Sequence, residues 1–248
     1  MNDVIKLSYI DDVIALVVME DRENRNTFSQ DFMQGLQKAF VAIANNTIVK
    51  TVVIHGYDNF FCCGGTKEEL IKLTDGKMTF ADLPFYRILL DCEVPVIAAM
   101  QGHAIGGGFA LGCFADLLVM AEEAFYATNF MKYGFTPGFG STYIVEKRLG
   151  KAIADSMLLG AQNYQGGQLK QWGASTNIVK KADVIPTAIA LAKTLSQKPR
   201  NALMQLKAHL SAEIKRELPA IIEQEVAMHR VTFGRPEVKQ RINELFGR

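Results

Sequence analysis

The sequence predicts an α/β fold, and three observations lead to this prediction. Short apolar runs, such as residues 51–54 (TVVI) and 117–121 (LLVMA), are typical of buried strands. Helix-like segments separate these runs, so strands and helices alternate along the chain. Two of the connections are glycine-rich turns, at residues 61–65 (FCCGG) and 105–108 (IGGG). A chain of 248 residues, 49% of them apolar and 21% charged, has ample material for a core.

The first elements are two strands and a helix. Residues 4–8 and 13–19 are predicted strands joined by a turn of two aspartates. Thr27 and Gln30 have the spacing of a capping box, which predicts that a helix opens there. The apolar face of this helix carries Phe32, Met33, Leu36 and Phe40.

The middle of the chain alternates strands, glycine turns and helices. The strand at 51–54 leads to the first glycine turn, and Thr66 with Glu69 forms a capping box that opens a helix. A further helix is predicted from Asp82 and Pro84 onward. Next come a strand at 94–100, the second glycine turn, a helix at 109–115 and the strand at 117–121.

After about residue 185 the strand patterns stop. Helical patterns cover residues 187–197, 201–215 and 219–233, and Pro236 ends the last of them. We therefore predict a core over residues 1–185 and a helical C-terminal region over residues 186–248.

Composition excludes several classes of function. The formal net charge is +1, with basic residues scattered, so no dedicated nucleic-acid surface is predicted. No signal peptide is expected, and no apolar run approaches the ~20 residues that span a bilayer. The four cysteines show no CxxC spacing, so neither a metal site nor a disulfide framework is expected. We expect a reduced, cytoplasmic protein without membrane association.

The glycine turns belong to a wider pattern. Residues 92–108 (CEVPVIAAMQGHAIGGG) closely resemble the central signature of the crotonase (enoyl-CoA hydratase/isomerase) superfamily, and residues 61–65, 115–116 and 134–138 stand at the spacings of that family. The resemblance covers nearly the whole chain. It implies a spiral superhelix of ββα units, a helical C-terminal trimerisation region, and a homotrimer or a dimer of trimers.

The resemblance assigns an oxyanion hole to the backbone N–H groups of Gly65 and Gly107. Two such donors would hold the oxygen of a polarised thioester carbonyl. Taken singly, each turn is also explained by tight packing of a strand against a helix. Together and in the register of the family, we interpret them as functional.

The chain departs from the hydratases of this family at two positions. Those enzymes carry glutamates where this sequence has Ala110 and Phe130. Adding water to a double bond needs a general base and a general acid. Alanine and phenylalanine supply neither, which argues against a hydratase.

A narrower resemblance fits better. Residues 90–93 (LDCE), 127–138 (ATNFMKYGFTPG) and 228–233 (MHRVTF) look like the decarboxylases of polyketide β-branching cassettes. The implied substrate is a 3-methylglutaconyl-type thioester on an acyl carrier protein. The implied product is the decarboxylated enoyl thioester, formed without a metal or redox cofactor.

His229 is the candidate proton donor. It shares the apolar face of a helix with Ile222, Val226 and Phe233. The alternative is a core histidine satisfied by a carbonyl group, and the narrower resemblance favours catalysis. The other three histidines, His55, His103 and His209, are interpreted as structural.

A lysine is expected to hold the carboxylate of the substrate. The candidates are Lys67, Lys72 and Lys77, and we choose Lys77 because it lies in a predicted loop. Tyr86 and Tyr133 are candidates for lining the acyl pocket. Covalent catalysis by the cysteines at 62 and 63 is not expected, because no histidine adjoins them.

Two other functions stay open on the sequence alone. One is an enoyl-CoA isomerase-type reaction on an acyl-CoA, which needs a base that positions 110 and 130 do not supply. The other is a non-catalytic homologue that binds acyl chains, because binding alone would also retain the glycine turns.

Overall fold

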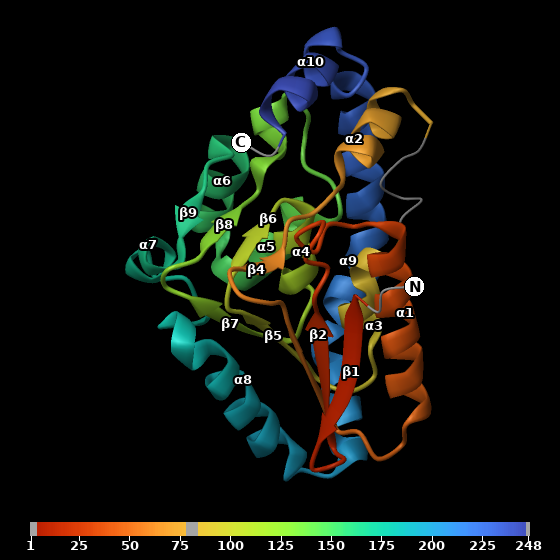
Figure 1. Cartoon of the computed structure of the whole chain (residues 1–248), viewed down its shortest axis with the longest axis vertical. Helices are drawn as coiled ribbons and strands as arrows, with labels where there is room; N and C mark the ends of the chain where they lie inside the picture. The colour runs from red at the N-terminus through yellow and green to blue at the C-terminus, as the bar shows by residue number, and fades with distance from the viewer. Residues whose placement is uncertain (1–3, 78–83, 247–248) are drawn as a thin grey trace.

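The computed structural model describes residues 4–77 and 84–246 and contains two sheets with helices around them (Figure 1). Asp82, where a helix is predicted to begin, lies outside the described residues. The larger sheet has the strand order β1-β2-β3-β5-β7-β10. Its strands are β1 (Ile5–Ile10), β2 (Ile14–Met19), β3 (Thr51–His55), β5 (Val96–Met100), β7 (Leu117–Ala121) and β10 (Asn177–Val179).

The smaller sheet has the order β4-β6-β8-β9. Its strands are β4 (Phe60–Cys62), β6 (His103–Ile105), β8 (Phe125–Ala127) and β9 (Tyr164–Gln165). Along the chain, β3 and β4 precede α2 (Lys67–Thr74), and β5 and β6 precede α4 (Gly107–Cys113). Two strands and a helix therefore repeat, as the predicted ββα spiral requires. Because β4 and β6 pair in parallel, the two glycine turns leave the same edge of the sheet.

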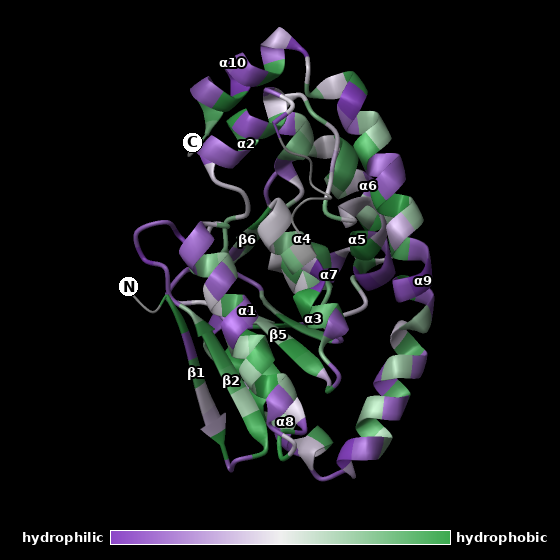
Figure 2. Cartoon of the chain, turned by 90° about the vertical axis from the view of Figure 1, so that its right-hand side faces the viewer, coloured by the Kyte–Doolittle hydropathy of each residue, from purple (hydrophilic) through white to green (hydrophobic). Residues whose placement is uncertain are grey.

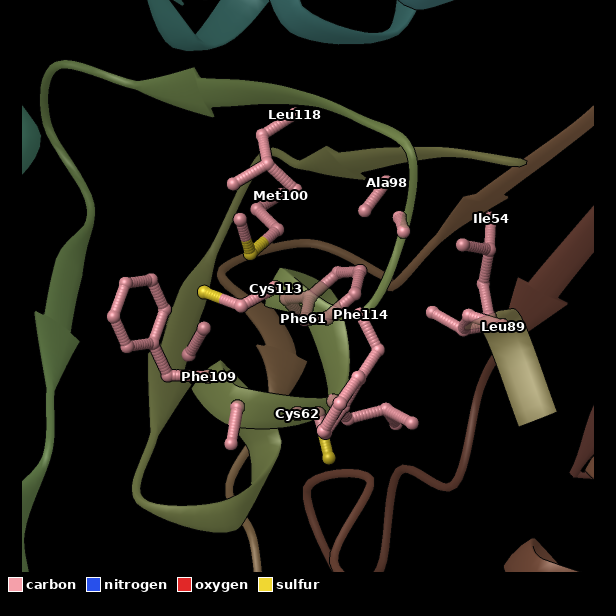
Figure 3. Close-up of a cluster of buried hydrophobic side chains, with 14 of the residues drawn as sticks. Ile54, Phe61, Cys62, Leu89, Ala98, Met100, Phe109, Cys113, Phe114 and Leu118 are labelled. Atoms are coloured by element: carbon pink, nitrogen blue, oxygen red, sulfur yellow. The ribbon is translucent and has the colours of Figure 1, made fainter. Parts of the chain in front are cut away.

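The core lies between the sheets, around α4. Every residue of α4 is buried. Figure 3 shows Phe109 and Cys113 of this helix among side chains of both sheets, including Phe61 and Met100. The strands β2 and β5 are hydrophobic along most of their length, since they lie in the interior (Figure 2).

The remaining helices cover the sheets. They are α1 (Gln30–Asn45), η2 (Pro84–Arg87), α3 (Ile88–Asp91), η3 (Asn129–Tyr133), α5 (Ser141–Leu149), α6 (Lys151–Gly160), α7 (Gly166–Gln171), α8 (Lys181–Ser196), α9 (Arg200–Thr232) and α10 (Pro236–Leu245). The capping box of Thr66 and Glu69 is confirmed at the start of α2. The one predicted at Thr27 is wrong, because Ser29 caps α1 and Thr27 instead bridges to Gly64.

The C-terminal helices differ from the predicted pattern in two ways. Helix α8 begins at Lys181 rather than at residue 187 and packs against β3, β5 and β7, so the proposed division at residue 185 falls inside it. The predicted break before Pro219 is wrong, because α9 continues through this residue. Leu218 and Ile222 are buried on either side of Pro219, and their packing offsets the lost backbone hydrogen bond.

A buried lysine ties α9 to the core. The Lys207 ammonium donates to the carbonyl oxygens of Leu89 and Val94, each at 3.1 Å, and lies 2.8 Å from Asp116 Oδ2. Lys207 is only 5% exposed. In the described parts of the chain, no helix is long and apolar enough to cross a membrane.

Candidate active site

The two glycine turns meet at the carboxyl ends of the parallel strands β4 and β6. Gly64 has a φ of +78°, and a Cβ atom there would lie 2.7 Å from the Ile105 carbonyl oxygen and 3.1 Å from the Gly107 nitrogen. No side chain fits at this contact without moving a backbone. The two glycine turns therefore pack directly against each other.

Gly65 and Gly107 both line a cavity beside this contact. Within residues 4–77 and 84–246, neither of their N–H groups donates to a backbone carbonyl. Gly107 opens α4, where the first N–H groups of a helix have no intrahelical acceptor. Two unpaired donors in one wall are what a developing oxyanion needs.

The cavity is small and apolar, with a volume of about 40 Å³. The described residues that line it are Cys63, Gly65, Leu70, Ile105, Gly106, Gly107, Asn129, Phe130, Tyr133, Phe135, Phe139 and Phe246. This set contains no carboxylate.

The two positions that carry acids in hydratases are filled by apolar side chains. Phe130 lines the cavity, and Ala110 is completely buried. Tyr133 lines the cavity as expected. Tyr86 does not line it and instead packs against Phe139 of the wall, with ring centres 5.4 Å apart. A base for proton abstraction is therefore missing from both expected places.

His229 is buried against the loop that follows η3. Its Nε2 lies 3.0 Å from the Thr136 carbonyl oxygen and 2.9 Å from that of Pro137, so Nε2 carries the proton. Burial lowers the pKa of the imidazole below its usual value, although these carbonyls act in the opposite direction. The ring contacts Phe233, which stacks on Phe135 of the cavity wall. His229 itself does not line the cavity.

Lys77 lies just beyond the C-terminal end of α2. Its side chain is 70% exposed and is 3.5 Å from Asp75, which also pairs with Lys239 of α10 at 2.7 Å. These pairs hold the pKa of Asp75 below its usual value, mainly through Lys239. Lys67 and Lys72 are exposed on α2. None of the three lysines lines the cavity.

Burial keeps the two cysteines of the first turn, Cys62 and Cys63, from acting as thiolate nucleophiles. Burial raises the pKa of the Cys63 thiol to about 11, so it stays neutral near pH 7. Cys62 is fully buried, and its thiol donates to the Asn26 carbonyl oxygen at 2.9 Å. All four cysteines of the chain are free. Among the described residues, no group of histidine, cysteine or acidic side chains is arranged to hold a metal ion.

Comparisons with known proteins agree with this geometry. The family model for enoyl-CoA hydratase/isomerase matches residues 10–245. The chain is 47% identical, over 99% of both sequences, to the bacillaene synthase decarboxylase PksI of Bacillus subtilis.

Solved structures give the same result. One from a dehydratase/decarboxylase enzyme couple involved in polyketide β-branching superposes with a TM-score of 0.97 at 47% identity, covering 99% of this chain and all of that one. The ECH2 decarboxylase domain of CurF from Lyngbya majuscula superposes with a TM-score of 0.95 at 40% identity and the same coverage. This chain therefore belongs to the enoyl-CoA hydratase/isomerase (crotonase) family, and its similar relatives include decarboxylases of polyketide β-branching.

Proposed function

We propose that this protein removes CO₂ from a 3-methylglutaconyl-type thioester carried on the phosphopantetheine arm of an acyl carrier protein. The observation that carries the proposal is the pair of N–H groups, at Gly65 and Gly107, that have no acceptor among the described residues and line a cavity whose described lining contains no carboxylate. Such a site stabilises negative charge on a thioester oxygen but offers no base to begin a reaction. Decarboxylation by the relatives supports the same choice.

The proposed reaction needs only one proton. The bond between the carboxylate carbon and the γ carbon breaks, and its electron pair moves through the double bond onto the thioester oxygen. CO₂ leaves, and the resulting dienolate rests on the N–H groups of Gly65 and Gly107. A proton added at the γ carbon gives the α,β-unsaturated thioester, and one added at the α carbon gives the β,γ isomer.

Mass spectrometry of a loaded carrier protein tests this function directly. An acyl carrier protein bearing the 3-methylglutaconyl group is incubated with the enzyme, and the expected result is loss of the mass of one CO₂. An unchanged mass with a competent carrier protein contradicts the proposal. Assays for isomerisation of acyl-CoA substrates and for acyl binding would then separate the two alternatives.

We assign the proton transfer to His229. The carbonyls of Thr136 and Pro137 hold a proton on Nε2, and this is the proton that the ring would deliver to the dienolate. Phe135 of the cavity wall and Phe233 behind it separate His229 from the cavity, so the ring reaches the substrate only when the acyl group displaces these two side chains.

Replacing His229 by Ala is expected to lower turnover by about 10²–10⁴-fold, the usual contribution of a general acid. Binding of the loaded carrier protein should persist. NMR of the product should show a mixture of double-bond isomers, because water can then protonate either carbon. The matched control is His209→Ala at an exposed position of the same helix. Unchanged rate and isomer ratio would reduce His229 to an anchor for the neighbouring loop.

We assign the substrate carboxylate to Lys77. The residue is exposed and lies beside Asp75 at the end of α2, the helix that also supplies Leu70 to the cavity. Lys77→Met is expected to raise KM by about tenfold or more, the effect of losing a hydrogen bond to a charged group. Affinity for the decarboxylated product should not change. Lys72→Met is the control, and an equal effect of both variants would contradict the choice of Lys77.

We propose that the enzyme is a homotrimer that works in the cytoplasm. Exposed apolar side chains on α9, including Leu206 and Leu210 one turn apart, support a contact between copies of the chain through this helix. Light scattering should give three times the chain mass of 27.5 kDa, and Leu210→Glu should lower it. A monomer at micromolar concentration would contradict this assembly. Four free cysteines are consistent with a reducing compartment.

A further inference from the structure

Glu225 is a buried carboxylate that holds a backbone segment rather than a cation. Its residue is 1% exposed on α9. Oε2 accepts from the Gly140 N–H at 2.7 Å, and Oε1 accepts from the Thr142 N–H at 3.0 Å and from the Thr142 hydroxyl at 2.6 Å. Among the ion pairs of the described residues, none involves Glu225. The carboxylate therefore acts through the segment that contains these donors.

The held segment has an unusual backbone. Phe139 and Gly140 are both left-handed, with φ values of +65° and +68°. A non-glycine residue in this region is strained and persists only where its surroundings hold it. The two hydrogen bonds that Glu225 accepts from the N–H groups of Gly140 and Thr142 fix the C-terminal side of this pair and supply such a constraint.

Phe139 carries the constraint into the cavity. Its ring lines the wall and stacks on Phe28, with ring centres 5.3 Å apart. Phe28 in turn lies against Gly107, where an added Cβ would come within 2.7 Å of its ring. A continuous line of contacts therefore joins Glu225 to the second glycine turn.

His229, one turn further along α9, grips the other end of the same segment with the opposite polarity. Its Nε2–H donates to the carbonyls of Thr136 and Pro137, whereas Glu225 accepts from N–H groups near residue 140. The helix thus holds both ends of one loop, with Phe139 between them. Glu225 controls the end that carries the aromatic ring.

We propose that Glu225 is a positioning residue that fixes Phe139 in the cavity wall and thereby sets how the acyl group fits against the glycine turns. The effect on the acyl group rests on the proposed function, whereas the effect on Phe139 does not. Thr142 and the neighbouring Gly140 transmit the constraint. Phe139 is the group that meets the ligand.

The ionisation of Glu225 supports positioning over stabilisation. Burial raises its pKa to about 7, and the hydrogen bonds from Thr142 and Gly140 only partly oppose this shift. The folded protein therefore prefers the protonated acid, so ionisation of Glu225 costs stability as pH rises from about 4.5 to about 7. Tyr86, from η2, is the titratable group that faces it. Because its ionisation costs stability, Glu225 is not explained by a contribution to the stability of the fold.

The first test observes Phe139 itself in the free protein. The chain has 15 phenylalanines, and fluorophenylalanine labelling gives each a ¹⁹F resonance. The resonance that disappears in Phe139→Leu is assigned to Phe139. In Glu225→Gln this resonance should shift or broaden, whereas the exposed Glu223→Gln should leave it in place. Should Glu225→Gln fail to fold, Thr142→Val removes one donor and serves the same purpose.

The second test measures affinity for a saturated 3-methylglutaryl carrier protein, which cannot lose CO₂. Glu225→Gln should weaken binding by about tenfold. The same change made in a Phe139→Ala background should have no further effect, because the ring it positions is absent. An unmoved Phe139 resonance, or an undiminished effect in that background, overturns the inference. Failure of the wild type to release CO₂ would instead overturn the proposed reaction and leave the ¹⁹F result to decide the role of Glu225.

Discussion

Gly64→Ala is expected to lower kcat by about 10²–10³-fold, the usual cost of losing one oxyanion donor. The added Cβ would lie 2.7 Å from the Ile105 carbonyl oxygen and 3.1 Å from the Gly107 nitrogen. Both neighbours are backbone atoms, so the two turns must move apart. The N–H groups of Gly65 and Gly107 then no longer converge on one oxygen. The rate of CO₂ release under saturating substrate measures the effect.

Two alanine variants separate this effect from its alternatives. Gly65→Ala keeps the N–H group, and among the described residues its Cβ meets Leu70 alone, at 3.6 Å, so kcat should change little. Gly173→Ala imposes the same left-handed strain, at a φ of +84°, with nothing within 4 Å. It should lower the melting temperature without affecting kcat. A folded Gly64→Ala enzyme with normal kcat would contradict the oxyanion assignment.

Lys207→Met is expected to lower the free energy of unfolding by about 3–5 kcal/mol, because it leaves Asp116 without its cation and two carbonyls without their donor. Such a loss is a large part of the stability of an ordinary domain, about 5–15 kcal/mol. Chemical denaturation measures it. The ion pair is worth this much only because Lys207 is buried.

A second lysine on the same helix provides the control. Lys215 lies 3.9 Å from Asp91, and both side chains are more than a third exposed. Lys215→Met should therefore change stability by no more than about 1 kcal/mol. Asp116→Asn combined with Lys207→Met should recover part of the loss, since no unpaired charge remains. Equal losses of stability in Lys207→Met and Lys215→Met would show that the burial of Lys207 does not strengthen its ion pair.

The sequence predicted elements well where the signal is local. The capping box at Thr66 and the buried strands are decided by neighbouring residues, and both are confirmed. The predictions of a helix cap at Thr27 and of a helix break before Pro219 were wrong because tertiary contacts override local preference at both positions. Thr27 lies in a bridge to Gly64, and the backbone N–H of Phe28 donates to the Gly64 carbonyl oxygen at 2.8 Å. Capping patterns carry no information about such long-range pairing.

The candidate site follows the same division. The glycine turns could be predicted because their chemistry depends on the backbone of short segments. Phe139, Asn129 and Phe246 line the cavity but carry no sequence signal that distinguishes them from ordinary side chains. Glu225 did leave a signal, because an acidic residue on the apolar face shared by Ile222 and His229 is unusual. Its partners near residue 140 lie some 85 positions away and could not be named from spacing.

Phe130 in the cavity wall also protects the product. Decarboxylation yields an enoyl thioester, which is the compound that the hydratases of this fold consume. With Phe130 in the wall and Ala110 buried, no side chain at either position can activate water against the new double bond. An acidic residue placed at 130 would have to ionise in an apolar environment, so we expect a single substitution there to leave the enzyme without hydratase activity. In the proposed reaction, the apolar surface that permits loss of CO₂ thus also leaves the new double bond of the product intact.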